Sequence, residues 1–146
     1  MMVKHIATLF DRDLQRLYTE IEAFPSEADL WRVSGVVANS AGNLCLHLCG
    51  NLEHFIGGLL GGSGYVRDRE HEFAARNIPR AELLAEVDRT RKALAKAFAA
   101  LGDERLQEPF PIPIQGEELN TAYFLLHLEG HLNYHLGQVN YLRRML

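Results

Sequence analysis

Apolar residues recur every three or four positions in four separate stretches of the chain, which is the period of a helix with one buried face. The stretches predict helices over about residues 3–24, 41–60, 80–101 and 121–146. No strand pattern competes with them, and only residues 112–115, next to two prolines, suggest an extended segment. The pattern therefore predicts an all-α fold, which we interpret as a four-helix bundle.

Residues that favour helix ends lie at the limits of these stretches. Pro25 follows the first stretch, and Pro79 precedes the third. Asn39 or Ser40 can cap the second stretch, and Gly61 follows it. The long inter-helix connections, about 15 to 20 residues each, exceed what antiparallel neighbours need. Such connections can cross the bundle or fold over a site, so the sequence leaves the up-down order of the helices open.

Length and charge restrict the class of protein. The 146 residues suit one domain, spanning residues 1–146, that can bury a core without a disulfide or a metal. A formal net charge of -4, with acids and bases interleaved, argues against a nucleic-acid partner. No signal-peptide pattern is present, and the most apolar region, residues 44–60, is interrupted by polar residues and too short for a membrane span. We therefore expect a cytoplasmic protein with reduced thiols and no membrane partner.

Three of the seven histidines, His127, His131 and His135, lie at intervals of four on the predicted last helix. Four residues advance a helix by about 6 Å and turn it by about 40°, so successive imidazoles can face one metal ion. Relative to the centre of the apolar face, His135 lies about 30° away, His131 about 70° and His127 about 110°. We therefore expect His131 and His135 to point inward, where a divalent ion or a hydrogen-bond network would satisfy their nitrogens.

The predicted second helix carries two more histidines. His47 and His54 share a face with Asn51, beside the apolar stripe of that helix. A third ligand from a facing helix would complete a three-histidine site of the kind built in bundle cores, and geometry leaves both histidines eligible. Cys45 and Cys49 lie about 200° around the helix from His47. We expect these thiols to behave as small apolar core residues.

Two blocks of the sequence resemble a known family. The first is N-L-C-L-H-L-C-G-N-L at residues 43–52, and the second is H-L-N-Y-H-L-G-Q-V at residues 131–139. Together they resemble the DinB-like superfamily of bacterial four-helix-bundle metalloproteins, and within it a branch with L-H-L-C-G-N and Y-H-x-G-Q signatures. The resemblance covers essentially the whole chain.

The resemblance implies a divalent metal, usually nickel or zinc, bound by one histidine of the second helix and two of the last. On the matching positions these ligands are His47, His131 and His135, and His54 falls outside the motif. Members of this superfamily are often homodimers. They include thiol S-transferases and isomerases that use a low-molecular-weight thiol such as bacillithiol or mycothiol, and others are classed as metal-dependent hydrolases.

Three neutral imidazoles leave a coordination position for water or substrate, as in catalytic zinc sites. We therefore expect a metal-dependent enzyme that acts on a small molecule, with a thiol S-transferase ahead of a hydrolase. The opposing hypothesis is a non-catalytic metal-binding or dimeric interaction protein. No general base can be assigned from the sequence.

Several residues lie close enough to the ligands in the sequence to orient them or to transfer protons. These candidates are Asn51, His54, His127, Glu129, Tyr134 and Gln138. The charged connection at residues 65–76 fits either a lid over the site or a solvated loop.

Overall fold

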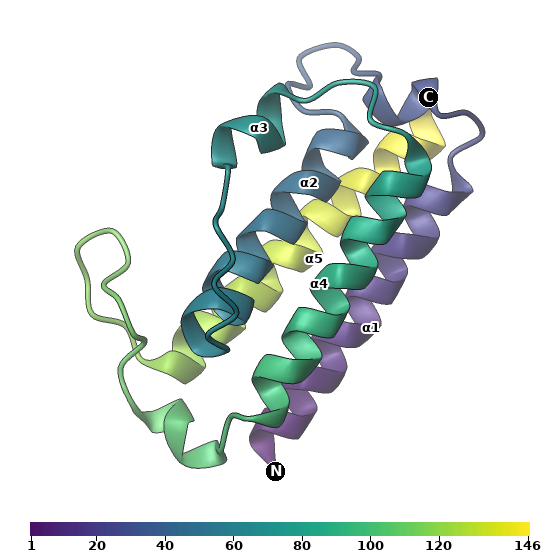
Figure 1. The fold of residues 1–146 in the computed structure, drawn as a ribbon. Helices are drawn as coiled ribbons and strands as arrows, with labels where there is room; N and C mark the ends of the chain where they lie inside the picture. The colour runs from purple at the N-terminus through teal and green to yellow at the C-terminus, as the bar shows by residue number, and fades with distance from the viewer.

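Four long helices run alongside one another in the computed structural model, which describes residues 1–146 (Figure 1). They are α1 (Met2–Ala23), α2 (Ala41–Leu52) with its continuation η2 (Glu53–Leu60), α4 (Arg80–Ala99) and α5 (Thr121–Met145). Three short elements lie in the connections: η1 (Ala28–Trp31), α3 (Arg69–Ala74) and η3 (Asp103–Gln107). The all-α prediction is therefore confirmed, and none of these helices has the length and apolar character of a membrane span.

Local sequence chemistry explains where the long helices begin. The Ser40 hydroxyl accepts a hydrogen bond from the Asn43 backbone N–H at 3.2 Å and caps α2. Asn120 caps α5 in the same way. Pro79 fixes the backbone just before α4. The predicted starts of these three helices are confirmed, whereas α3 and the other short elements have no counterpart in the sequence-based assignment.

The predicted extended segment between α4 and α5 is a loop with two isolated β-bridges. One joins Pro109 to Asn120 and the other joins Ile114 to Glu117. No strand forms, because the prolines of this loop have no N–H to donate to a ladder.

The order of the helices, which the sequence leaves open, follows from their contacts. α1 packs against α4 and α5, and α2 packs against the same two helices from the opposite side. Arg80, at the start of α4, donates to the backbone oxygens of Glu22 and Phe24 at the end of α1. α1 and α5 run in one direction, and α2 and α4 run in the other (Figure 1). The long connections allow this arrangement because two of them reach across the bundle ends.

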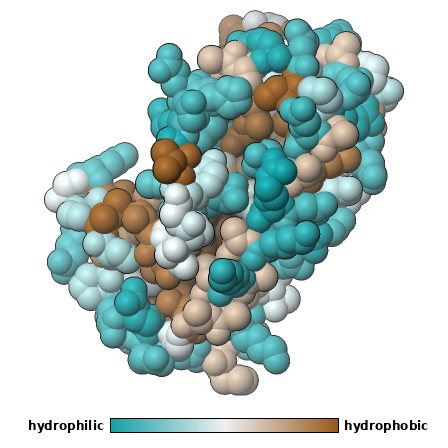
Figure 2. Space-filling view, viewed as in Figure 1, coloured by the Kyte–Doolittle hydropathy of each residue, from teal (hydrophilic) through white to brown (hydrophobic).

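A single cluster of 31 buried apolar residues fills the space between the four helices. Its leucines include Leu48 of α2 and Leu132 of α5, which are both fully buried. The face of the molecule in Figure 2 is mainly hydrophilic, with separate apolar patches. The burial pattern therefore agrees with the apolar periodicity of each helix.

The second predicted helix contains a change of helical type. Its last eight residues, η2, form a π-helix, in which each N–H bonds to the carbonyl five residues earlier. Glu53 begins this segment and is buried. Burial, together with the neighbouring charge of Glu86, raises the pKa of Glu53 to about 7, and Arg89 opposes the shift. Ionisation of Glu53 therefore destabilises the folded protein.

We expect Glu53→Gln to stabilise the protein at pH 8 and to have a much smaller effect at pH 5. The folded pKa of about 7 lies above the ordinary value of 4.5, so the stabilisation from protonated Glu53 is complete below 4.5 and is lost as the pH rises through 7. A neutral amide avoids this loss and should gain about 2 to 3 kcal/mol at pH 8. Urea unfolding at both pH values measures the difference. The exposed Glu117→Gln is the control, and an equal gain for Glu53→Gln at pH 5 would contradict the assignment.

Candidate metal centre

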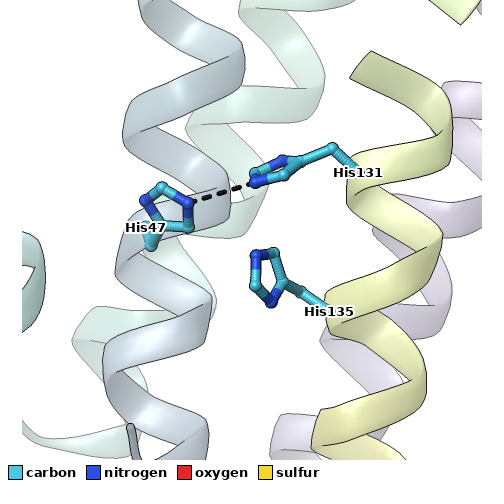
Figure 3. A group of neighbouring side chains, drawn as sticks. All are labelled: His47, His131 and His135. Carbon is cyan, nitrogen blue, oxygen red and sulfur yellow. Dashed lines mark hydrogen bonds between the residues drawn. The ribbon is translucent and has the colours of Figure 1, made fainter. Parts of the chain in front are cut away.

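Three imidazoles converge between α2 and α5 (Figure 3). His47 comes from α2, and His131 and His135 come from successive turns of α5. One ring nitrogen of each histidine lies within 4.8 Å of the other two. The Nε2 atoms of His47 and His131 are 3.2 Å apart. The structure thus brings together the three histidines that the two sequence blocks single out.

The helical repeat explains this convergence. His131 and His135 are separated by one turn, and the fully buried Leu132 lies between them on the core side of α5. On α2, His47 lies next to the fully buried Leu48, on the side that faces α5. Because α2 and α5 are antiparallel and in contact, one imidazole of α2 meets two from α5.

The donor set fits a divalent ion. Two imidazole nitrogens bound tetrahedrally to one zinc ion at about 2.1 Å would lie about 3.4 Å apart, close to the observed 3.2 Å between His47 and His131. The Nδ1 atom of His131 is buried and has no hydrogen-bond partner. An ion bound at Nε2 would not contact this Nδ1 atom, so the fit to a divalent ion rests on the spacing of the Nε2 atoms.

Burial keeps the two α5 imidazoles neutral, which is the form that coordinates metal. Burial, together with the nearby imidazoles of His135 and His47, lowers the pKa of His131 to about 4. Burial also lowers the pKa of His135, although its hydrogen bond to Gln138 opposes the shift. Both rings are only half-buried, so the centre remains open to solvent, as a catalytic site requires.

A buried carboxylate lies behind His47. Oε1 of Glu72 is 3.0 Å from Nδ1 of His47. Arg67 donates to both carboxylate oxygens, from Nε to Oε2 at 2.9 Å and from Nη2 to Oε1 at 3.0 Å. Burial alone raises the pKa of Glu72, but the hydrogen bonds from His47 and Arg67 outweigh it and hold the pKa below its ordinary value. Glu72 is therefore ionised at neutral pH.

Gln138 has a similar position behind His135. Its Oε1 atom lies 2.7 Å from Nδ1 of His135, so the Nε2 atom of that ring stays free. The exposed ring of Tyr134 meets His135 edge-on, with 5.3 Å between ring centroids. The structure places both candidates beside the ligand to which they are adjacent in the sequence.

The other histidine candidates lie outside the three-histidine group. The ring of His54 packs against Phe55, with 4.7 Å between centroids. His127 stacks on Phe124 at 5.9 Å and is exposed. Asn51 is buried one turn after His47, and its Oδ1 atom has no hydrogen-bond partner.

Two further expectations concern residues on other faces of the helices. Glu129 accepts a hydrogen bond from Asn133 at 2.9 Å, and Asn133 also donates to Asp13 of α1. Glu129 therefore belongs to the contact between α1 and α5 and does not orient a metal ligand. Cys45 and Cys49 are buried free thiols within the apolar cluster, as expected.

The residues that sequence reasoning missed lie in the connection at 65–76. We expected a lid or a solvated loop there, but Glu72 is only 4% exposed. The ring of Phe73 packs on His47 with 4.7 Å between centroids, and Arg69 lies over Phe73. The six residues of α3 are too few to show a helical period. The one available signal was an acidic residue next to an aromatic one within a charged segment.

Comparison with known proteins and families identifies one family match. A family model described as DinB superfamily matches residues 9–139. No curated protein matches the sequence. The match covers all of α2 and the part of α5 up to residue 139, and therefore all three converging histidines.

We expect the imidazole of His131 to titrate near pH 4 in protein stripped of metal with a chelator. Burial and the neighbouring imidazoles disfavour its charged form, so the ring should stay neutral at pH 5.5. Heteronuclear NMR of the histidine side chains measures the midpoint, and His131→Asn assigns the signal. A midpoint near the reference value of about 6.5 would contradict the described environment.

Proposed function

Because the chain belongs to the DinB superfamily, we propose that it is a metal-dependent enzyme that transfers a low-molecular-weight thiol to a small electrophilic molecule. In this proposal His47, His131 and His135 bind one divalent ion, zinc or nickel. The observation that carries it is the convergence of three imidazoles on one point of a half-open site.

The ligand set determines the chemistry available. A divalent ion held by three neutral imidazoles would keep its full positive charge and would favour the ionised form of a bound thiol or water. No carboxylate belongs to the ligand group. This charge favours an anionic reactant in the remaining position, such as the thiolate that a transferase requires.

The side chains around the centre have separate tasks in the reaction. Glu72 and Gln138 hold two of the imidazoles in position, each through Nδ1. Phe73 packs on His47 and excludes water from that side of the ring. During transfer, the thiol proton passes to solvent, a bond forms between sulfur and the electrophilic carbon, and the bond from that carbon to its leaving group breaks.

Hydrolysis is the second candidate function, because the same open site would favour hydroxide over water. A hydrolase would form a carbon–oxygen bond where the transferase forms a carbon–sulfur bond.

The homodimer implied by the resemblance stays a prediction, which light scattering of the purified protein would test.

We expect tag-free protein to contain one divalent ion per chain and His47→Ala, His131→Ala or His135→Ala to lose it. Removing one of three ligands leaves two imidazoles, too few to hold the ion through purification. Elemental analysis by mass spectrometry measures the content. His54→Ala and His127→Ala are matched controls and should retain the metal. Wild-type protein without stoichiometric metal, or unchanged metal in His131→Ala, would refute the proposed site.

We expect the metal-loaded protein to consume a small thiol in the presence of an electrophile and His131→Ala to reduce the rate to background. The assay screens bacillithiol, mycothiol and glutathione against a panel of electrophilic substrates, with thiol loss and adduct mass as readouts. Product formation without thiol would favour the hydrolase. No turnover with any substrate, from protein with full metal content, would favour the non-catalytic alternative.

A further inference from the structure

We propose that Glu72 is a positioning residue for His47, and that position 50 is a glycine because the Glu72 carboxylate occupies the space of its side chain. The inference rests on the proposed metal site. It assigns a role to two residues that are not ligands and that come from different elements, α3 and α2.

The first observation is the space at Gly50. A β-carbon on this residue would lie 2.7 Å from the carboxyl carbon of Glu72, 3.4 Å from its Cγ, and closer still to Oε2. Such contacts are sterically excluded, so any larger residue would displace the carboxylate. Glycine is also the least favourable residue in a helix interior apart from proline. Gly50 therefore lowers the helix propensity of α2 but leaves room for the Glu72 carboxylate.

The second observation is the position of the admitted carboxylate. Glu72 is 4% exposed, and its Oε1 atom lies 3.0 Å from Nδ1 of His47. A carboxylate can only accept, so Nδ1 must carry the proton. The Nε2 lone pair of His47 is then directed toward His131 and His135. Glu72 thus selects the tautomer that can bind metal and increases the basicity of the ring.

Arg67 makes this arrangement possible. A lone carboxylate behind His47 would be costly to bury, and the two hydrogen bonds from Arg67 offset its charge. A buried ion pair of this kind seldom adds net stability compared with apolar packing. Its contact with a proposed ligand is therefore the better explanation of why it is present.

The third observation is that the α3 segment packs against one face of α2. Asn43 Nδ2 donates to the backbone oxygens of Glu72 at 3.1 Å and Ala75 at 2.9 Å. Asn43, His47 and Gly50 stand at positions i, i+4 and i+7, which share a helix face. This face anchors the α3 backbone, presents the ligand and accommodates the carboxylate, in that order along the helix.

A double-mutant cycle in zinc affinity tests the inference. We expect Gly50→Ala and Glu72→Ala each to weaken zinc binding by about 10- to 100-fold. In the Glu72→Ala background, Gly50→Ala should add less than about twofold, because the space at position 50 is then free. Competition with a chromophoric chelator measures the affinity. Equal losses from Gly50→Ala in both backgrounds, or no loss in either, would overturn the inference.

Two variants control for general effects of these substitutions. Gly130→Ala places alanine at a helical glycine of α5 with no heavy atom within 4 Å of the new β-carbon. Glu70→Ala removes an exposed carboxylate from α3. Both should leave zinc affinity within about twofold of the wild type, since exposed sites without special contacts tolerate substitution.

A second readout does not depend on metal. Alanine has a higher helix propensity than glycine, so Gly50→Ala should raise the melting temperature in the Glu72→Ala background. In the wild type the same substitution should lower it, because the new β-carbon clashes with the Glu72 carboxylate. Nitrogen-15 NMR of chelator-treated protein should show His47 protonated at Nδ1, and Glu72→Ala should lose this preference. If Gly50→Ala fails to fold, the zinc affinity and the His47 tautomer of Glu72→Ala and Glu72→Gln test the inference instead. Glu72→Gln should stay closer to the wild type, because its amide oxygen can still accept a hydrogen bond from Nδ1 of His47. Wild-type protein that binds no zinc would refute the proposed function, whereas an unchanged His47 tautomer in Glu72→Ala would refute this inference alone.

Discussion

The antiparallel contact between α2 and α5 is the constraint on which the rest of the site depends. It places one imidazole of α2 opposite two turns of α5, and the same contact continues away from the site as the packing of Phe55 on Phe124, with 5.0 Å between ring centroids. Apolar packing therefore fixes the distance between the helices before any ion contributes. The polar groups of the site occupy positions that the core has already defined.

Around this contact the buried polar atoms differ in how many hydrogen bonds the protein gives them. His47 is fully supported, since Glu72 receives hydrogen bonds from it and from Arg67. On the opposite helix, Nδ1 of His131 has no partner. Buried polar groups are normally satisfied, and exceptions gather where chemistry occurs. His47 is thus oriented by hydrogen bonds of the protein, whereas the orientation of His131 depends on packing without a hydrogen bond at Nδ1.

Much of the fold could be read from the sequence because its signals are local. Ser40, Pro79 and Asn120 mark helix starts through their own chemistry, and the apolar stripe of α5 is sufficient to orient its histidines. Other features depend on distant partners. Glu72 lies 25 residues from His47 on a helix too short to show a period. The sequence alone does not separate His47 from His54, because both lie on one face of the predicted second helix. Only the position of α5 shows that His47 faces the other two histidines.

The wide separation of the ligands along the chain has a consequence for biosynthesis. His47 and His131 are 84 residues apart, and α5, which carries His131, is synthesised after the other helices of the bundle. Until α5 is synthesised, a nascent chain therefore presents a single imidazole of this group. A chain interrupted before α5 would lack the three-histidine group, so any capture of an ion by this group can begin only after α5 has been synthesised.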